Sequence, residues 1–211
     1  MSSNDYFRQR FEEEVRTTRD ALGPNFDGLD LGYVSIGFLN KVFNSKSPNR
    51  LRESLEEDVK KLNMEDVFNL EDIERLESTV RMRAPKLYSI LLMINHSHRI
   101  VRLVKHDPPI DDSIFNAALK SKLSYCSEER LIEEPLLCDI AANFYKAQWR
   151  IPPRFNPGAH ESFPCTLFRF PFVGAPAYKD NGSWGVVYRA KIADCHLTSD
   201  PSVPVRARPF Y

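Results

Sequence analysis

Residues 85–94 read Pro-Lys-Leu-Tyr-Ser-Ile-Leu-Leu-Met-Ile. A proline at the first position suits the first turn of a helix, where its missing N–H removes no hydrogen bond. The residues that follow are apolar on nearly every face of such a helix. A helix of this kind is normally enclosed by others at the centre of a core. We therefore expect a helical domain built around this segment.

The flanking segments repeat apolar residues every three or four positions, which is typical of amphipathic helices. The three stripes before residue 85 are Phe7, Phe11 and Val15; Leu51, Leu55, Val59 and Leu62; and Leu70, Ile73, Leu76 and Val80. The helix over residues 51–62 is expected to carry its charged residues, Asp58 included, on a solvated outer face. Residues 26–43 are ambiguous because three glycines weaken a helix there, although apolar residues recur at every fourth position.

After residue 94 the chain predicts shorter helices separated by prolines. Apolar residues 100–104 continue the helical pattern until Asp107-Pro108-Pro109 ends it. Asp111, Asp112 or Ser113 is expected to cap a short helix reaching Leu119. Pro135 is expected just inside a helix that carries Leu136, Ile140 and Phe144.

The composition changes near residue 150. The last 61 residues hold 9 of the 15 prolines and a net charge of +3, which leaves −3 for the rest. Two strand-like runs are expected there, at Thr166–Phe172 and Gly185–Ile192. The sequence therefore predicts a mainly α protein with a helical domain over 3–148, a proline-rich linker over 149–165, and a short β-hairpin fragment within 166–211.

The composition also narrows the class of protein. The chain has 211 residues, 42% hydrophobic and 27% charged, and its 29 basic residues equal its 29 acidic ones, so neither nucleic acid nor a membrane is an expected partner. The apolar run near residues 87–94 is far shorter than the ~20 residues of a membrane span. The four cysteines are Cys126, Cys138, Cys165 and Cys195, with no C-x-x-C pair. No signal peptide is visible, so we expect a cytoplasmic or nuclear protein that is not secreted.

Residues 179–188 read Lys-Asp-Asn-Gly-Ser-Trp-Gly-Val-Val-Tyr. A Gly-x-x-Gly turn between two strands lets the backbone approach a phosphate without an intervening Cβ. The segment resembles the glycine-rich loop of a protein kinase, G-x-G-x-x-G-x-V. The nucleotide-binding residues that this resemblance implies are Asp180, Asn181, Gly182, Ser183, Trp184, Gly185 and Val187. An ordinary hairpin turn remains the alternative.

The resemblance departs from the kinase pattern at its first glycine, where this chain has Asp180. A carboxylate about 4 Å from a phosphate would cost on the order of 1 kcal/mol in water and about 4 kcal/mol at a partly buried site. Weak affinity for nucleotide is therefore expected. In the resemblance, Gly182 and Gly185 take the second and third glycines, and Val187 takes the position that covers the adenine ring.

Upstream segments extend the resemblance. They are Ala84–Leu91, Ile110–Ser113, Ala147–Phe155 and Phe170–Phe172. Together with the glycine loop they resemble the N-terminal region of fungal serine/threonine protein-kinase-like proteins, in which a helical extension precedes the kinase domain. On this reading residues 166–211 are the first two strands of a truncated kinase N-lobe.

The catalytic motifs of a kinase are not in the sequence. His98-Arg99 is followed by Ile100 rather than aspartate, there is no Asp-Phe-Gly, and the chain stops about where Val-Ala-x-Lys would follow. We therefore expect no catalytic residue, no metal ligand and no cofactor, since ATP and magnesium are implied only for a complete kinase. The expected function is a non-catalytic regulatory or interaction module whose protein partner is unknown. A free-standing helical adaptor and an ATP-binding kinase in full-length form are the alternatives.

Four polar pairs invite other interpretations. His96 and His98 could ligate a metal, but two residues apart on a helix they are expected to point to nearly opposite sides. Cys195-His196 could act as a nucleophile and base, although no third partner is identifiable. Asp111-Asp112 is expected to cap a helix rather than bind metal. In Gln148-Trp149, burial of the indole against the helices is preferred to a role in binding a partner.

Overall fold

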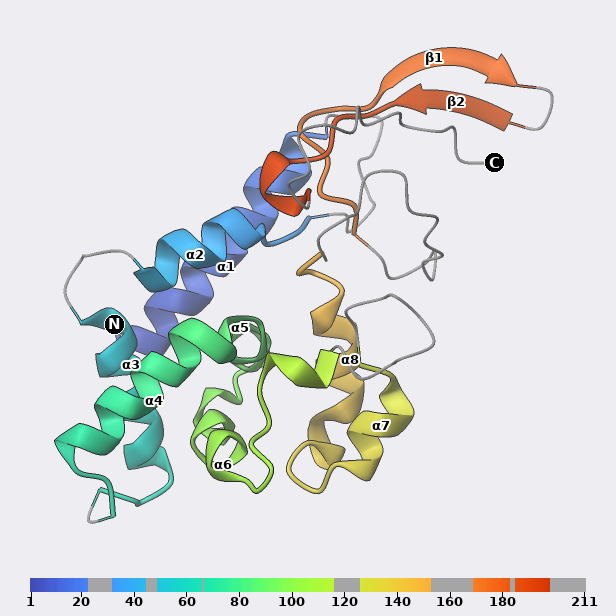
Figure 1. The fold of residues 1–211 in the computed structure, drawn as a ribbon. Helices are drawn as coiled ribbons and strands as arrows, with labels where there is room; N and C mark the ends of the chain where they lie inside the picture. Colours follow the sequence, from blue (N-terminus) through green and yellow to red (C-terminus); the bar gives the residue numbers. More distant parts are fainter. Residues whose placement is uncertain are drawn as a thin grey trace.

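The computed structural model describes residues 1–22, 32–44, 49–65, 67–115, 126–152, 169–182 and 185–197. The α-helices of this part of the chain are α1 (Ser3–Asp20), α2 (Ile36–Asn44), α3 (Arg50–Lys61), α4 (Leu70–Arg83), α5 (Pro85–Met93), α6 (Ile100–Lys105), α7 (Glu128–Glu133) and α8 (Ala141–Gln148). Short 3-10 turns are η2 (Ser97–Arg99), η3 (Asp112–Phe115), η4 (Cys138–Ile140) and η5 (Asp194–His196). The expected mainly helical character is confirmed (Figure 1).

Helix α5 lies at the centre of the core, as its apolar sequence predicts. Residues 87–92 are all buried, and the helix contacts α1, α2, α4, α6 and α8. An aromatic row connects it to its neighbours: Phe7 of α1 lies against Phe43 of α2, and Phe43 lies against Tyr88 of α5. Burial of these large side chains is the main stabilising contribution to the domain.

Helices α1 and α4 are each capped at the N-terminus by the side chain of the residue just before the helix. Ser2 caps α1 by accepting the Asp5 N–H at 3.1 Å. Asn69 and Asp72 form a reciprocal capping box at the start of α4. These contacts satisfy backbone N–H groups that have no partner within the helix.

Asp112 caps a helix, but not the one that was expected. Its carboxylate accepts the backbone N–H groups of Lys86 at 3.0 Å and Leu87 at 2.8 Å, at the start of α5. Its own segment, η3, is a single turn, and residues 116–119 of the expected helix lie outside the described residues. The first turn of α5 has no side-chain cap from its own sequence, so a carboxylate brought close by the fold takes that place.

The expected helix around Pro135 is wrong in its boundaries. Helix α7, which the apolar spacing did not reveal, ends before Glu134, and α8 begins at Ala141. Glu134 has an extended backbone, with φ −84° and ψ 108°. The residue before a proline is disfavoured in the helical region, so Pro135 separates two helices instead of starting one.

The strands form one antiparallel hairpin, β1 (Ala177–Gly182) and β2 (Gly185–Arg189). The register shifts between Tyr178 and Asp180, which makes Lys179 the extra residue of a bulge. Beyond its base, Phe172 and Ile192 form an isolated antiparallel bridge. In Figure 1 the hairpin projects away from the helices.

The strand expected at Thr166–Phe172 is not present where that range is described, since only Phe172 takes part in a bridge. The strand that pairs with β2 is the polar segment Ala177–Gly182, which lacks apolar alternation. Its pairing is set by the two-residue connection between Gly182 and Gly185.

Candidate functional site

The glycine segment lies on the hairpin, with its flanks paired. The backbone pairs are Asp180 with Val187, Asn181 with Val186, and Gly182 with Gly185. Ser183 and Trp184, between the two glycines, lie outside the described residues. The backbone is therefore that of a glycine hairpin, which both the kinase-type loop and an ordinary turn would adopt.

A docking contact fixes the base of the hairpin to the helical body. The Tyr33 hydroxyl donates to the carbonyl oxygen of Phe172 at 3.2 Å. The backbone N–H of Ile36 donates to Nε2 of His196 at 3.1 Å, and the His196 ring is fully buried edge-to-face against Tyr33. Because Ile36 opens α2, the imidazole caps that helix. Segments about 140 to 160 residues apart are thereby held together.

This geometry gives the Cys195-His196 pair a structural role. The Nε2 lone pair of His196 is occupied by the Ile36 N–H. Cys195 lies beside Gly37 of α2 in the same contact. An imidazole that accepts a backbone hydrogen bond with this nitrogen does not have it available to remove a thiol proton.

We expect the change His196→Ala to release the base of the hairpin while the helices stay folded. The Ile36 N–H would lose its buried acceptor, a loss of roughly 1–3 kcal/mol to the local opening free energy. Amide hydrogen exchange at residues 171–173 and 191–193 should accelerate, with exchange in α5 unchanged. His98→Ala, at a histidine outside the docking contact, is the matched control. Equal exchange in wild type and His196→Ala would contradict the docking role.

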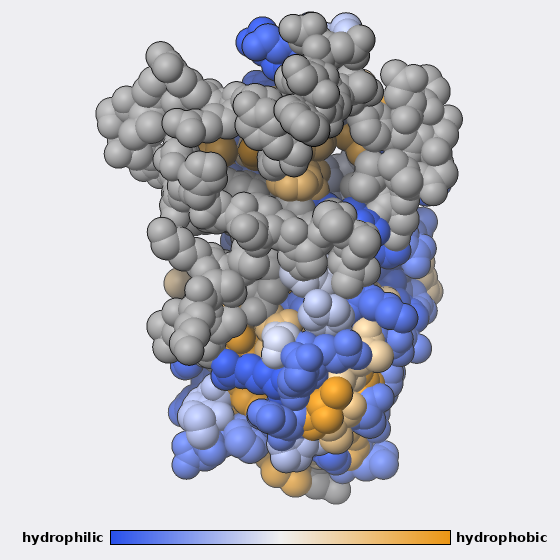
Figure 2. All heavy atoms as spheres, turned by 90° about the vertical axis from the view of Figure 1, so that its right-hand side faces the viewer, coloured by the Kyte–Doolittle hydropathy of each residue, from blue (hydrophilic) through white to orange (hydrophobic). Residues whose placement is uncertain are grey.

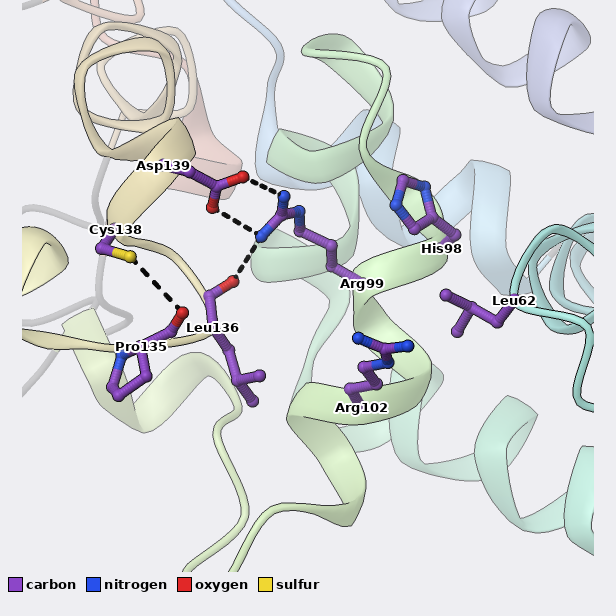
Figure 3. Close-up of a pocket in the computed structure, with 8 residues that line it drawn as sticks. All are labelled: Leu62, His98, Arg99, Arg102, Pro135, Leu136, Cys138 and Asp139. Atoms are coloured by element: carbon purple, nitrogen blue, oxygen red, sulfur yellow. Dashed lines mark hydrogen bonds and ion pairs between the residues drawn. The ribbon is translucent and has the colours of Figure 1, made fainter.

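A cavity of about 320 Å³ opens between η2, α6 and the turn over residues 135–139. Figure 3 shows the side chains around it. They are Leu62, His98, Arg99, Arg102, Pro135, Leu136, Cys138 and Asp139. We call this space the arginine cavity.

Arg99 fixes one wall of the arginine cavity. Its Nη1 donates to the Leu136 carbonyl oxygen at 2.8 Å and to Asp139 Oδ1 at 2.8 Å, and its Nη2 donates to Asp139 Oδ2. The hydrogen bonds from Arg99 lower the pKa of Asp139. A bidentate pair of this kind holds both side chains in one orientation and joins η2 to η4.

The other wall carries basic groups. Arg102 is exposed and makes no hydrogen bond or ion pair within the described residues. Burial lowers the pKa of His98, and the positive charge of Arg99 lowers it further. The rings of His96 and His98 lie 5.9 Å apart between centroids, so the expectation that they point to opposite sides is wrong. The reason is that η2 begins at Ser97, so His96 precedes the helical turn.

A second polar cluster lies within the core. Asp58, expected on the solvated face of α3, is fully buried instead. Its carboxylate accepts hydrogen bonds from Asn4 Nδ2 at 3.0 Å, from the Tyr88 hydroxyl at 2.9 Å and from the Ser97 hydroxyl at 2.6 Å. Ser54 hydrogen-bonds to both Asn4 and Tyr88. Burial raises the pKa of Asp58 to about 6, against the lowering effect of these donors.

The other residues that the sequence suggested as functional candidates contribute to the fold. Gln148 is buried, and its side-chain amide pairs with the backbone of Cys126 at 2.9 and 2.7 Å. Trp149 is 4% exposed, as expected for a residue anchored against the helices. Asp111 accepts the backbone N–H of Ser113 and pairs with Arg83. Within the described ranges, no three His, Cys, Asp or Glu side chains come together as metal ligands would.

The arginine cavity was not predicted from the sequence. Arg99 and Arg102 are spaced at i and i+3 around an otherwise apolar run, and this was the available signal. No sequence pattern pointed to Asp139 and Leu136, because they lie about 40 residues from Arg99 in the sequence and meet it only in the folded chain.

Comparison of the chain with models of known protein families, with curated protein sequences and with solved structures gives no match. In the part of the chain that the structure describes, every helix is too short or too polar to cross a lipid bilayer.

Proposed function

We propose that this chain is a non-catalytic regulatory or interaction module of a serine/threonine protein-kinase-like protein. In this proposal the helical body carries and orients a glycine-containing hairpin. The docking contact supports it most directly, because half-buried hydrogen bonds of Tyr33 and His196 attach the hairpin base to the segment before α2 and to the first residue of α2. A hairpin of two strands is marginally stable alone and needs such a support.

The non-catalytic part of the proposal rests on how the ionisable groups are used. His196 caps α2, Asp112 caps α5, and Asp58 accepts three hydrogen bonds inside the core. Each of these groups serves the fold. His98-Arg99 is followed by Ile100 and not by the aspartate of a kinase catalytic loop. A cytoplasmic or nuclear location accompanies the proposal, in keeping with the free thiols of Cys126, Cys138 and Cys195.

The proposal predicts that Mg-ATP leaves the melting temperature of the full chain unchanged. The reason is that Asp180 would place a carboxylate near the phosphates of a bound nucleotide, which weakens nucleotide binding. Differential scanning fluorimetry with excess Mg-ATP tests this, with Gly182→Val as the control. A rise in Tm seen in wild type and lost in Gly182→Val would overturn the proposal in favour of an ATP-binding kinase in its full-length form.

A free-standing helical adaptor is the second candidate, and exposed apolar side chains around α4 favour it. Val67 is 64% exposed, Leu70 65% and Met82 79%. On the face shown in Figure 2, polar side chains surround only small groups of apolar ones over the helical part. Binding of a partner that is lost in Leu70→Glu and retained in His196→Ala would favour the adaptor, since the hairpin would then play no part.

A further inference from the structure

We propose that the arginine cavity binds a phosphomonoester group. This site is separate from the glycine hairpin and does not depend on the function proposed above. Its recognising groups are Arg102, His98 and Arg99, which come from η2 and α6 and line one cavity that opens to solvent (Figure 3).

Arg102 is the main binding group in this proposal. Several other helical arginines of the described chain are paired with carboxylates, among them Arg52 with Glu74 and Glu77, and Arg81 with Glu77. Arg102 has no such partner among the described residues, although it lines a cavity. Its planar guanidinium offers parallel N–H donors whose spacing matches two oxygens of a phosphate.

Arg99 is already held in one orientation before a ligand binds beside Arg102. Its guanidinium is held by Asp139 and the Leu136 carbonyl oxygen, so the wall opposite Arg102 does not need to reorganise when a ligand enters. Figure 3 shows Arg99 turned toward Asp139, and Arg102 lying between Leu136 and Leu62.

The electrostatic environment favours a dianion. Around His98 lie Arg99, His96, Lys61 and Arg102, and each of these lowers the pKa of the His98 imidazole, as burial does. Asp139 is the one carboxylate in the lining, and it is already bound to Arg99. A phosphate dianion would neutralise the surplus positive charge, and it would make protonation of His98 easier.

The remaining lining suits a compact apolar body attached to the phosphate. Leu62, Pro135 and Leu136 form apolar surface beside the basic groups. The volume of about 320 Å³ lies at the lower end of small-molecule sites, whose range is about 300–1,000 Å³. A phosphorylated side chain or a small phosphate ester has this size and chemistry.

Isothermal titration of the full chain with phenyl phosphate tests the proposal. We expect saturable binding that Arg102→Ala weakens roughly tenfold or more, since a charge-assisted hydrogen-bond pair is lost. Arg102→Lys should recover part of the affinity because it keeps the charge without the planar fork. Arg16→Ala removes an exposed arginine of α1 that does not line the cavity, and its affinity should equal that of wild type.

A second readout separates binding at this site from binding elsewhere. The His98 imidazole resonances should shift on addition of phenyl phosphate, and its pKa should rise, in wild type but not in Arg102→Ala. Benzoate, a carboxylate with the same ring, is expected to bind more weakly. The proposal is overturned by no saturable binding up to about 10 mM, by equal affinity in wild type and Arg102→Ala, or by benzoate binding as tightly as phenyl phosphate.

Discussion

Replacing Asp58 by alanine is expected to lower the free energy of unfolding by about 3–5 kcal/mol. The change removes the acceptor of three donors in the core, on Asn4, Tyr88 and Ser97. These groups come from α1, α5 and η2, and no water-exposed position is available to them because Asp58 and its surroundings are buried. Chemical denaturation of Asp58→Ala beside wild type at pH 7 measures the loss.

Asp58→Asn is the matched control, because it keeps the shape and most of the hydrogen bonds. The asparagine oxygen can accept from Asn4 and Ser97, and its amide can donate to the Tyr88 hydroxyl. That hydroxyl can then donate to Ser54 instead, at the 2.6 Å contact already present. We expect Asp58→Asn to stay far closer to wild type than Asp58→Ala. Equal destabilisation by the two changes would contradict the assigned network.

The same pair of proteins gives a pH dependence with a defined sign. The pKa of Asp58 is about 6 in the folded chain, against a usual value of 3.8. Between about pH 4 and pH 6 the folded state keeps a proton that the unfolded state has released, so the free energy of unfolding falls as pH rises through this window. The shift of about 2 units in the pKa of Asp58 corresponds to roughly 3 kcal/mol of stability. This contribution is fully present below the unfolded pKa and is lost as the pH rises through the folded pKa.

Asp58→Asn should lack this dependence, since asparagine does not titrate. Burial also raises the pKa of Asp112 to about 6, so Asp112 titrates in the same window in both proteins. The difference in unfolding free energy between wild type and Asp58→Asn, measured from pH 4 to pH 7, therefore isolates Asp58. Parallel pH profiles of the two proteins would show that Asp58 is solvated, as its sequence context suggested.

Asp58 also illustrates what could not be predicted from the sequence. Helices α3, α4 and α5 were predictable because their apolar spacing repeats over many residues and their burial follows from it. Asp58 sits within a charged run, where a solvated position is the natural expectation. It is buried because three polar groups, from positions 4, 88 and 97, converge on it in the folded chain. No local pattern reports such a convergence.

The glycine hairpin and the arginine cavity also differ in how far the sequence could predict them. The glycine turn was predicted because its motif lies within ten consecutive residues, but the first strand of the hairpin was expected at Thr166–Phe172 and lies at Ala177–Gly182. The arginine cavity was not predicted, because its walls belong to η2, α6 and η4 and meet only through tertiary packing. The docking role of His196 was hidden for the same reason, since its partner is the backbone N–H of Ile36.

Replacing Gly32 by alanine is expected to lower the free energy of unfolding by about 3 kcal/mol. A Cβ at this position would lie 2.7 Å from Cγ1 of Val15 and closer still to the Val15 carbonyl oxygen. The Val15 side chain can rotate away, but its carbonyl belongs to the backbone of α1. Alanine therefore fits only if α1 and the segment before α2 move apart.

Hydrogen bonds made by the two residues after Gly32 oppose that movement. The Thr18 hydroxyl of α1 donates to the Tyr33 carbonyl at 2.8 Å and accepts the Tyr33 N–H at 2.9 Å. The next N–H, of Val34, donates to the Arg150 carbonyl at 2.6 Å. Separation of the segment from α1 would break the Thr18 bonds, and it would displace Tyr33, which holds the hairpin base at Phe172.

Gly37→Ala is the matched control for this prediction. Gly37 lies within α2, and a Cβ there would lie 3.3 Å from the Cys195 side chain, a tight contact with a side chain instead of a helix backbone. Alanine also gains about 1 kcal/mol of helix propensity over glycine, which offsets the crowding, so a change near zero is expected. Thermal unfolding of both variants, with hydrogen exchange at residues 171–173, measures the two effects. If Gly32→Ala melts with wild type and leaves that exchange unchanged, α1 and residue 32 do not make this close approach in solution, and the docking of the hairpin cannot depend on it.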